Sequence, residues 1–96
     1  MMHVTWAESA IADLNAIEAY LNDFSAAVAQ DTIDRILEAA VWLLDFRSAG
    51  SPFGYRRWRT WRPRKTRYIL IYEPTPGGIT VVRVRHGQQD WRAVID

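Results

Sequence analysis

The stretch YRRWRTWRPRKTRY, residues 55–68, gathers most of the side chains that could bind an anion. It carries seven positive charges, no negative charge and four aromatic rings. Arginine forms paired hydrogen bonds to phosphate and carboxylate groups and stacks on rings, which lysine does poorly. We therefore ask whether this stretch contacts a nucleic acid, an acidic protein partner, or only water.

The spacing of the rings bears on that choice. Trp58 and Trp61 are three residues apart, so in a regular strand they face opposite sides of the sheet. The arginines between and around them also alternate between the two faces. Sheets that bind RNA stack bases on neighbouring rings of one face. The stretch thus has the charge for a nucleic acid but lacks the ring geometry.

The net charge of +1 hides an uneven distribution along the chain. Residues 1–46 contain eight acidic residues and one basic residue, Arg35, whereas residues 47–96 contain eleven basic and three acidic ones. The two halves therefore carry −7 and +8. Attraction between an acidic half and a basic half could also drive association between copies of the chain, and such association would be salt-sensitive.

Length and composition indicate a single domain over residues 1–96, with 49% hydrophobic residues available for its core. The chain has no cysteine, which excludes disulfides and thiolate metal ligands. No acidic and histidine residues stand at metal-ligand spacing, so we expect no metal and no cofactor. The longest apolar run, residues 39–44, is too short to span a bilayer, and no signal peptide is recognisable. We expect a cytoplasmic protein.

Hydrophobic spacing predicts a short edge strand over residues 3–6 and then two helices, over 8–24 and 26–46. Ser25 is a good N-cap for the second helix, and the short break before it predicts an antiparallel hairpin. The side chains expected on the buried face of the first helix are Ile11, Leu14, Ile17, Leu21 and Phe24.

The second half of the chain reads as strands, because the apolar period changes to two. We predict a loop over 47–54 and strands over 55–61, 66–73 and 79–86. Tyr68, Leu70 and Tyr72 should share one face of their strand. In the last strand, Ile79, Val81, Arg83 and Arg85 should face opposite to Val84 and His86. The order β-α-α-β-β-β predicts an α+β fold, with the helical hairpin on one face of a small antiparallel sheet and arginines on the other.

Three segments of the chain resemble the RelE/ParE superfamily, the toxins of bacterial type II toxin–antitoxin and plasmid-stabilisation systems. These segments are WAESAIADLNAIEAYL (6–21), RYILIYE (67–73) and RVRHGQQDW (83–91), and together they cover nearly the whole chain. The matching residues are Trp6, Ala10, Asp13, Leu14, Ile17, Tyr20, His86, Gly87, Asp90 and Trp91. The chain departs from the family at Ala7, where Ser or Thr is common, and at Arg47, where proline is common.

The resemblance implies two alternative activities. ParE-like members inhibit DNA gyrase without a hydrolytic site, and the chain is more similar to these. RelE-like members cleave messenger RNA at the ribosome, and by that resemblance Arg67 and Arg83 would bind phosphate and His86 would donate a proton. These arginines could instead pair with Glu73 or Asp90, and His86 could be purely structural. A third alternative is a degenerate module that binds an antitoxin but has no cellular target.

The resemblance also implies a partner, because antitoxins of such systems carry an acidic C-terminal segment that folds on binding. We interpret residues 55–68 mainly as the surface that docks this segment and overlaps the target-binding face. The residues expected to contact the antitoxin or the target are Arg56, Arg57, Trp58, Arg59, Trp61, Arg62, Arg64 and Arg85.

Overall fold

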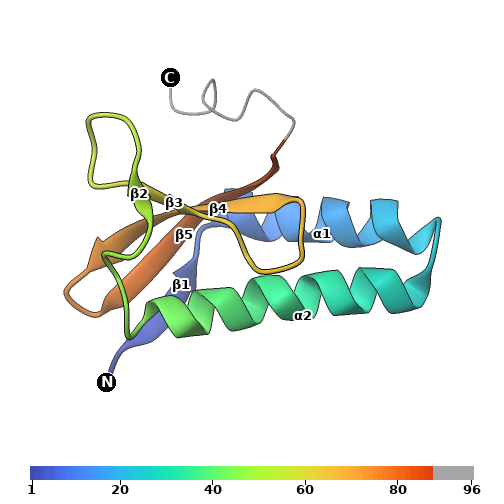
Figure 1. The fold of residues 1–96 in the computed structure, drawn as a ribbon, viewed down its shortest axis with the longest axis horizontal. Helices are drawn as coiled ribbons and strands as arrows, with labels where there is room; N and C mark the ends of the chain where they lie inside the picture. The colour runs from blue at the N-terminus through green and yellow to red at the C-terminus, as the bar shows by residue number, and fades with distance from the viewer. Residues whose placement is uncertain (88–96) are drawn as a thin grey trace.

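The computed structural model describes residues 1–87. Its elements, in chain order, are β1 (His3–Trp6), α1 (Glu8–Asn22), α2 (Ala26–Leu43), β2 (Ser51–Pro52), β3 (Arg59–Trp61), β4 (Tyr68–Thr75) and β5 (Gly78–His86) (Figure 1). The α+β class is therefore confirmed, with a two-residue strand, β2, in addition to the expected elements. Asp90 and Trp91, which contribute to the family resemblance, lie outside the described residues.

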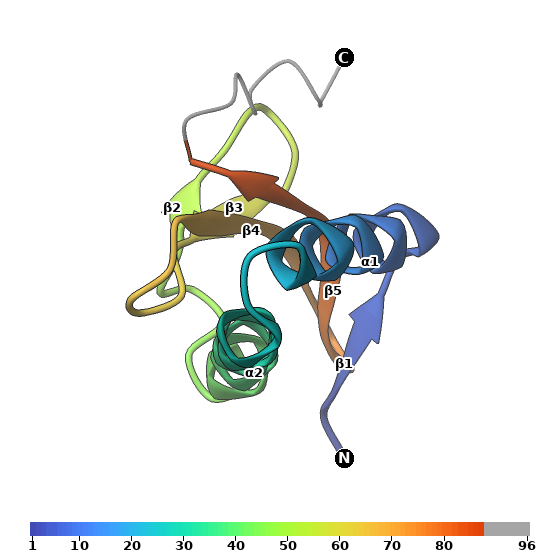
Figure 2. The same ribbon diagram turned by 90° about the vertical axis from the view of Figure 1, so that its right-hand side faces the viewer.

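The two helices form the expected hairpin, because the short segment between them ends α1 and supplies Ser25 as the N-cap of α2. Ser25 Oγ accepts a hydrogen bond from the backbone N–H of Val28 at 3.2 Å, which satisfies one of the free donors at the start of α2. Ala7, the residue before α1, offers no such side-chain bond. Figure 2 shows the two helices side by side, seen nearly end-on.

The five strands form one sheet in the order β1-β5-β4-β3-β2. The pairs β2–β3, β3–β4 and β4–β5 are antiparallel. The pair β1–β5 is parallel, with His3 opposite Gly78. The sheet is mixed because β1 is followed by two helices rather than by a tight turn, and such a long connection allows a parallel neighbour. The expectation of an antiparallel sheet holds for every pair except this one.

The core lies between the helices and one face of the sheet. The prediction for β4 is confirmed, since Tyr68, Leu70 and Tyr72 all belong to this core. The other buried members are Ala10, Ile17, Ile36, Ala40, Leu43, Ile79, Val81 and Val84.

The predicted alternation along β5 is wrong. A register shift between Ile71 and Tyr72 places an extra residue in β5, so that Leu70 lies opposite Val84 but Tyr72 lies opposite Val81. Such a bulge lets Val81 and Val84 enter the same core although they are three residues apart. Neither the bulge nor its position is visible in the residue pattern.

Two further predictions fail in the strands and helices. Residues 55–61 are not one strand, because β3 begins only at Arg59 and the chain before it forms a loop closed by a 2.9 Å bond from Phe53 N to Trp58 O. On α1, Ile11 is about half exposed, and Phe24, just beyond its end, is 72% exposed, rather than buried. Within residues 1–87, no helix is both long and apolar enough to cross a membrane.

Candidate functional site

The basic stretch 55–68 does not form one surface, because part of it serves the fold. Trp61 stacks on Trp42 of α2 with ring centroids 5.0 Å apart, and Trp42 stacks on Phe46 at 4.5 Å. Trp61 thus fixes β3 to the second helix. Its ring faces the helices instead of a partner, as expected for a residue opposite Leu70 in the register.

Arg59 is also engaged within the molecule. Its Nη1 donates to the carbonyl oxygens of Gly50 at 2.6 Å and Ser48 at 3.2 Å. Tyr72 also binds this segment, since its hydroxyl donates to Arg47 O at 2.8 Å and accepts from Gly50 N at 3.0 Å. Burial raises the pKa of Tyr72, which keeps this hydroxyl neutral. Together these bonds hold the loop after α2 against the sheet.

Arg83, the second arginine proposed to bind phosphate, forms an ion pair with Asp13 of α1. Its Nε and Nη2 donate to the two carboxylate oxygens at 2.7 and 3.0 Å, and Val84 N donates to Asp13 Oδ2 at 2.9 Å. The hydrogen bonds that Arg83 donates to the Asp13 carboxylate raise the pKa of Arg83. The expected partners of Arg83 were Glu73 or Asp90, so this pairing was missed.

Asp13 has a structural role at the edge of the sheet. Next to it on α1, Ser9 Oγ donates to Val82 O at 2.9 Å. β1 ends at Trp6, so beyond it β5 would present unpaired backbone groups. Ser9 and Asp13 of α1 bond to backbone groups of that stretch and so join the helix to the edge of β5.

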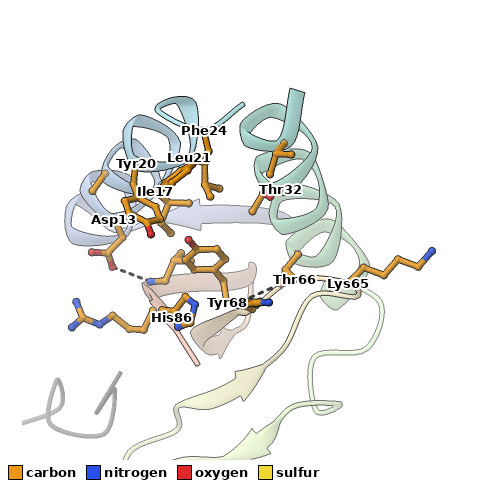
Figure 3. Close-up of a pocket in the computed structure, with 15 residues that line it drawn as sticks. Asp13, Ile17, Tyr20, Leu21, Phe24, Thr32, Lys65, Thr66, Tyr68 and His86 are labelled. Atoms are coloured by element: carbon orange, nitrogen blue, oxygen red, sulfur yellow. Dashed lines mark hydrogen bonds between the residues drawn. The ribbon is translucent and has the colours of Figure 1, made fainter. Parts of the chain in front are cut away.

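A groove of about 770 Å³ lies between α1, the start of α2, the β3–β4 connection and the end of β5. Figure 3 shows Ile17, Tyr20, Leu21 and Phe24 along its helical wall, with Tyr68 facing them from the sheet. Lys65, Arg67, Arg85 and His86 also line it. The groove therefore has an apolar wall on the side of the helices and a cationic rim formed by Lys65, Arg67 and Arg85.

The contacts around Tyr68 and Arg85 define the rim of this groove. The ring of Tyr68 meets the ring of His86 edge to face at 5.3 Å, and burial, followed by the nearby Tyr20, raises the pKa of Tyr68. Arg85 Nε is the one buried side-chain nitrogen or oxygen without a hydrogen-bond partner in the described part of the chain.

Comparison with known proteins decides the family. Residues 4–91 match the model of the family described as "ParE toxin of type II toxin-antitoxin system, parDE". The chain belongs to this family. A solved structure titled "Chromosomal ParDE TA system from P. aeruginosa" is similar to the chain, with a TM-score of 0.77 and 22% identity, over 90% of this chain and 96% of that one. No curated protein matches.

The three residues that the resemblance to RelE-like members proposed for catalysis do not all lie on one surface. Arg67 and His86 share the groove, whereas Arg83 is held by Asp13 at the edge of β5. Among residues 1–87 there is also no group of three acidic or histidine side chains that could hold a metal ion. The ParE-family fold thus presents two of the three expected residues on one surface.

The residues proposed to bind a partner are likewise spread over different surfaces. Arg85 lines the groove, and Arg62 lies next to Gly87 at the end of β5. Arg64 is exposed in the β3–β4 connection. Three others, Arg56, Arg57 and Trp58, lie in the loop before β3.

Sequence reasoning missed the apolar wall of the groove, which is formed by Tyr20, Phe24 and Val28. All three are exposed, although two of them continue the apolar stripe of α1. A signal was present, because a stripe that reaches past a helix end into the turn is longer than the sheet can cover.

Proposed function

We propose that this ParE-family chain is a toxin that arrests growth by binding a replication target such as DNA gyrase, and that a cognate antitoxin neutralises it by docking in the groove. The observation that supports this most directly is the groove itself. It exposes large apolar side chains beside Lys65, Arg67 and Arg85, and none of these three cations has an ion-pair partner within the described residues.

The helical wall of the groove offers a reason for a partner to bind. Phe24 is 72% exposed and contacts Tyr20 edge to face, with ring centroids 5.2 Å apart. A contiguous exposed apolar surface beside a hollow is typical of a binding site. An amphipathic segment of an antitoxin would cover these rings with its apolar face, as helices do in hydrophobic grooves.

The cationic rim gives the charge that the partner must complement. No acidic residue lies between Asp45 and Glu73, and Asp13, which lines the groove, is already paired with Arg83. Lys65, Arg67 and Arg85 line the groove, and we include the nearby Arg62 and Arg64 among the proposed contacts. Carboxylates of an acidic antitoxin segment would pair with these groups in charge-assisted hydrogen bonds.

Expression with and without the neighbouring antitoxin gene tests the proposal. We expect the chain alone to arrest growth, and co-expression to restore growth and yield a complex. Arg67→Ala should weaken antitoxin binding about tenfold, the value of a hydrogen bond to a charged group. Asn15→Glu, an exposed change on α1 outside the groove, lowers the net charge equally and should have no effect.

A chain that never arrests growth would contradict the toxin function and favour the degenerate module. The target is tested separately, by inhibition of supercoiling by purified DNA gyrase. Growth arrest without any effect on supercoiling would exclude gyrase but leave the toxin function intact.

The ribonuclease alternative rests on Arg67 and His86 sharing the groove. It predicts that His86→Ala abolishes growth arrest and that messenger RNA is cut while the wild-type chain is expressed. The proposed target-binding function predicts that the same variant still arrests growth. Measuring both growth and RNA integrity distinguishes the two.

A further inference from the structure

The loop between β2 and β3, residues 53–58, projects from the sheet (Figure 1). Its base is closed by the bond from Phe53 N to Trp58 O, and by the pairing of Pro52 with Arg59 just outside it. Phe53 is buried, whereas Tyr55 at the tip is 89% exposed. The loop is therefore anchored at its base and presents its tip to solvent.

The guanidinium of Arg56 lies over the rings of both Tyr55 and Trp58. The guanidinium carbon is 5.0 Å from the centre of the Trp58 ring and 6.0 Å from that of Tyr55. Stacking on a ring leaves the N–H groups at the edge of the guanidinium available for an anion. Because the rings already hold the side chain, less conformational entropy is lost when an anion binds.

A hollow of about 280 Å³ adjoins Arg56. It is lined by Pro52, Arg56, Arg57, Trp58, Arg59 and Pro74. Within the described residues, Arg56 and Arg57 have no ion-pair partner, and no carboxylate lies among the lining residues. Arg59 already donates to Gly50 O and Ser48 O, so Arg56 and Arg57 are the guanidinium groups at this hollow that remain available for an anion.

We propose that the loop 53–58 is a contact surface for acidic side chains of the toxin's protein target, separate from the antitoxin groove. This inference rests on the proposed toxin function and assigns the target to a different surface. The residues that carry it are Tyr55, Arg56, Arg57 and Trp58.

The chemistry of the loop favours a protein over a nucleic acid. The guanidinium of Arg56 lies over the rings of both Tyr55 and Trp58, so a base that stacked on either ring would compete with Arg56 for the face that it covers. Tyrosine, tryptophan and arginine are the residues that contribute most to protein–protein binding energy.

The loop and the groove are separate surfaces. They share no lining residue, and they lie at opposite ends of β4, with Tyr68 in the groove and Pro74 in the hollow. Six residues of an extended strand span about 20 Å. Mutations in one surface should therefore leave binding at the other unchanged.

The test measures three properties of the full chain: growth arrest, binding to the antitoxin from the neighbouring gene, and binding to DNA gyrase without DNA. We expect Arg56→Ala and Arg57→Ala each to weaken gyrase binding at least tenfold and to reduce growth arrest. Antitoxin affinity should stay within twofold of the wild-type value, which also shows that the variants fold. Asn15→Glu, with the same change of net charge, should behave as the wild-type chain.

The possible outcomes separate this inference from the proposed function. If both loop variants arrest growth as strongly as the wild-type chain, the loop is not the target surface, although the toxin function stands. If they lose antitoxin and target together, the two surfaces are not separate. If a duplex DNA probe binds the wild-type chain and Arg56→Ala abolishes that binding, the partner is a nucleic acid and the proposal is wrong. A wild-type chain that binds antitoxin but never arrests growth overturns both proposals.

Discussion

Removing the Phe24 ring should weaken antitoxin binding while leaving the chain folded. A phenylalanine side chain has about 200 Å² of surface, so the exposed 72% leaves about 140 Å² for a partner to cover. At about 25 cal/mol per Å², and allowing for what alanine retains, Phe24→Ala should cost about 3 kcal/mol of binding free energy. This corresponds to roughly a hundredfold increase in Kd.

Isothermal titration of the purified antitoxin into each variant measures this effect. Phe46→Ala provides the matched control, because Phe46 is also an exposed phenylalanine, at 51%, but lies outside the groove. Each variant loses a ring contact within the chain, with Tyr20 or with Trp42, so thermal unfolding should be measured for both. If Phe24→Ala binds the antitoxin as tightly as Phe46→Ala does, the groove is not the docking site.

Three further predictions concern the fold that positions these surfaces. Asp13→Ala should lower the free energy of unfolding, measured in urea, by about 2–4 kcal/mol, because Arg83 and the backbone N–H of Val84 lose their acceptor. An unchanged free energy of unfolding would contradict the structural role of the Asp13–Arg83 pair. Gly78→Ala should destabilise the chain by several kcal/mol, because a Cβ at Gly78 would lie 2.0 Å from His3 O and the residue has a φ of +144°. Gly77→Ala is the control, since a Cβ at Gly77 would meet no atom nearer than 3.9 Å. The pKa of Tyr72 is raised in the folded chain, so the unfolded chain loses this proton first, and the free energy of unfolding should fall as pH rises above about 10. Tyr72→Phe should lessen that fall, and a variant with the same pH profile as the wild-type chain would refute the assignment.

The fold could be predicted where one face of an element is buried. The cap at Ser25 and the shared face of Tyr68, Leu70 and Tyr72 both follow from local sequence, and the structure confirms them. The bulge in β5 could not be predicted, because it depends on how that strand pairs with β4 rather than on its own residues.

The candidate site was predicted less well, since its parts come from distant segments. The sequence shows the charge of residues 55–68, but not that Trp61 turns to Trp42 or that Arg59 bonds to Gly50. The pairing of Asp13 with Arg83 joins residues from opposite ends of the chain, and no local pattern indicates it. Phe24 was placed in the core because helical spacing alone does not show where the sheet ends.

The parallel pairing of β1 with β5 has a consequence for synthesis. Within residues 1–87, β1 pairs with β5 alone, so the sheet cannot be completed until residues 78–86 have left the ribosome. The core to which β1, α1 and β5 all contribute is likewise assembled only after β5 has emerged, so a nascent chain that lacks β5 has neither the complete sheet nor the complete core.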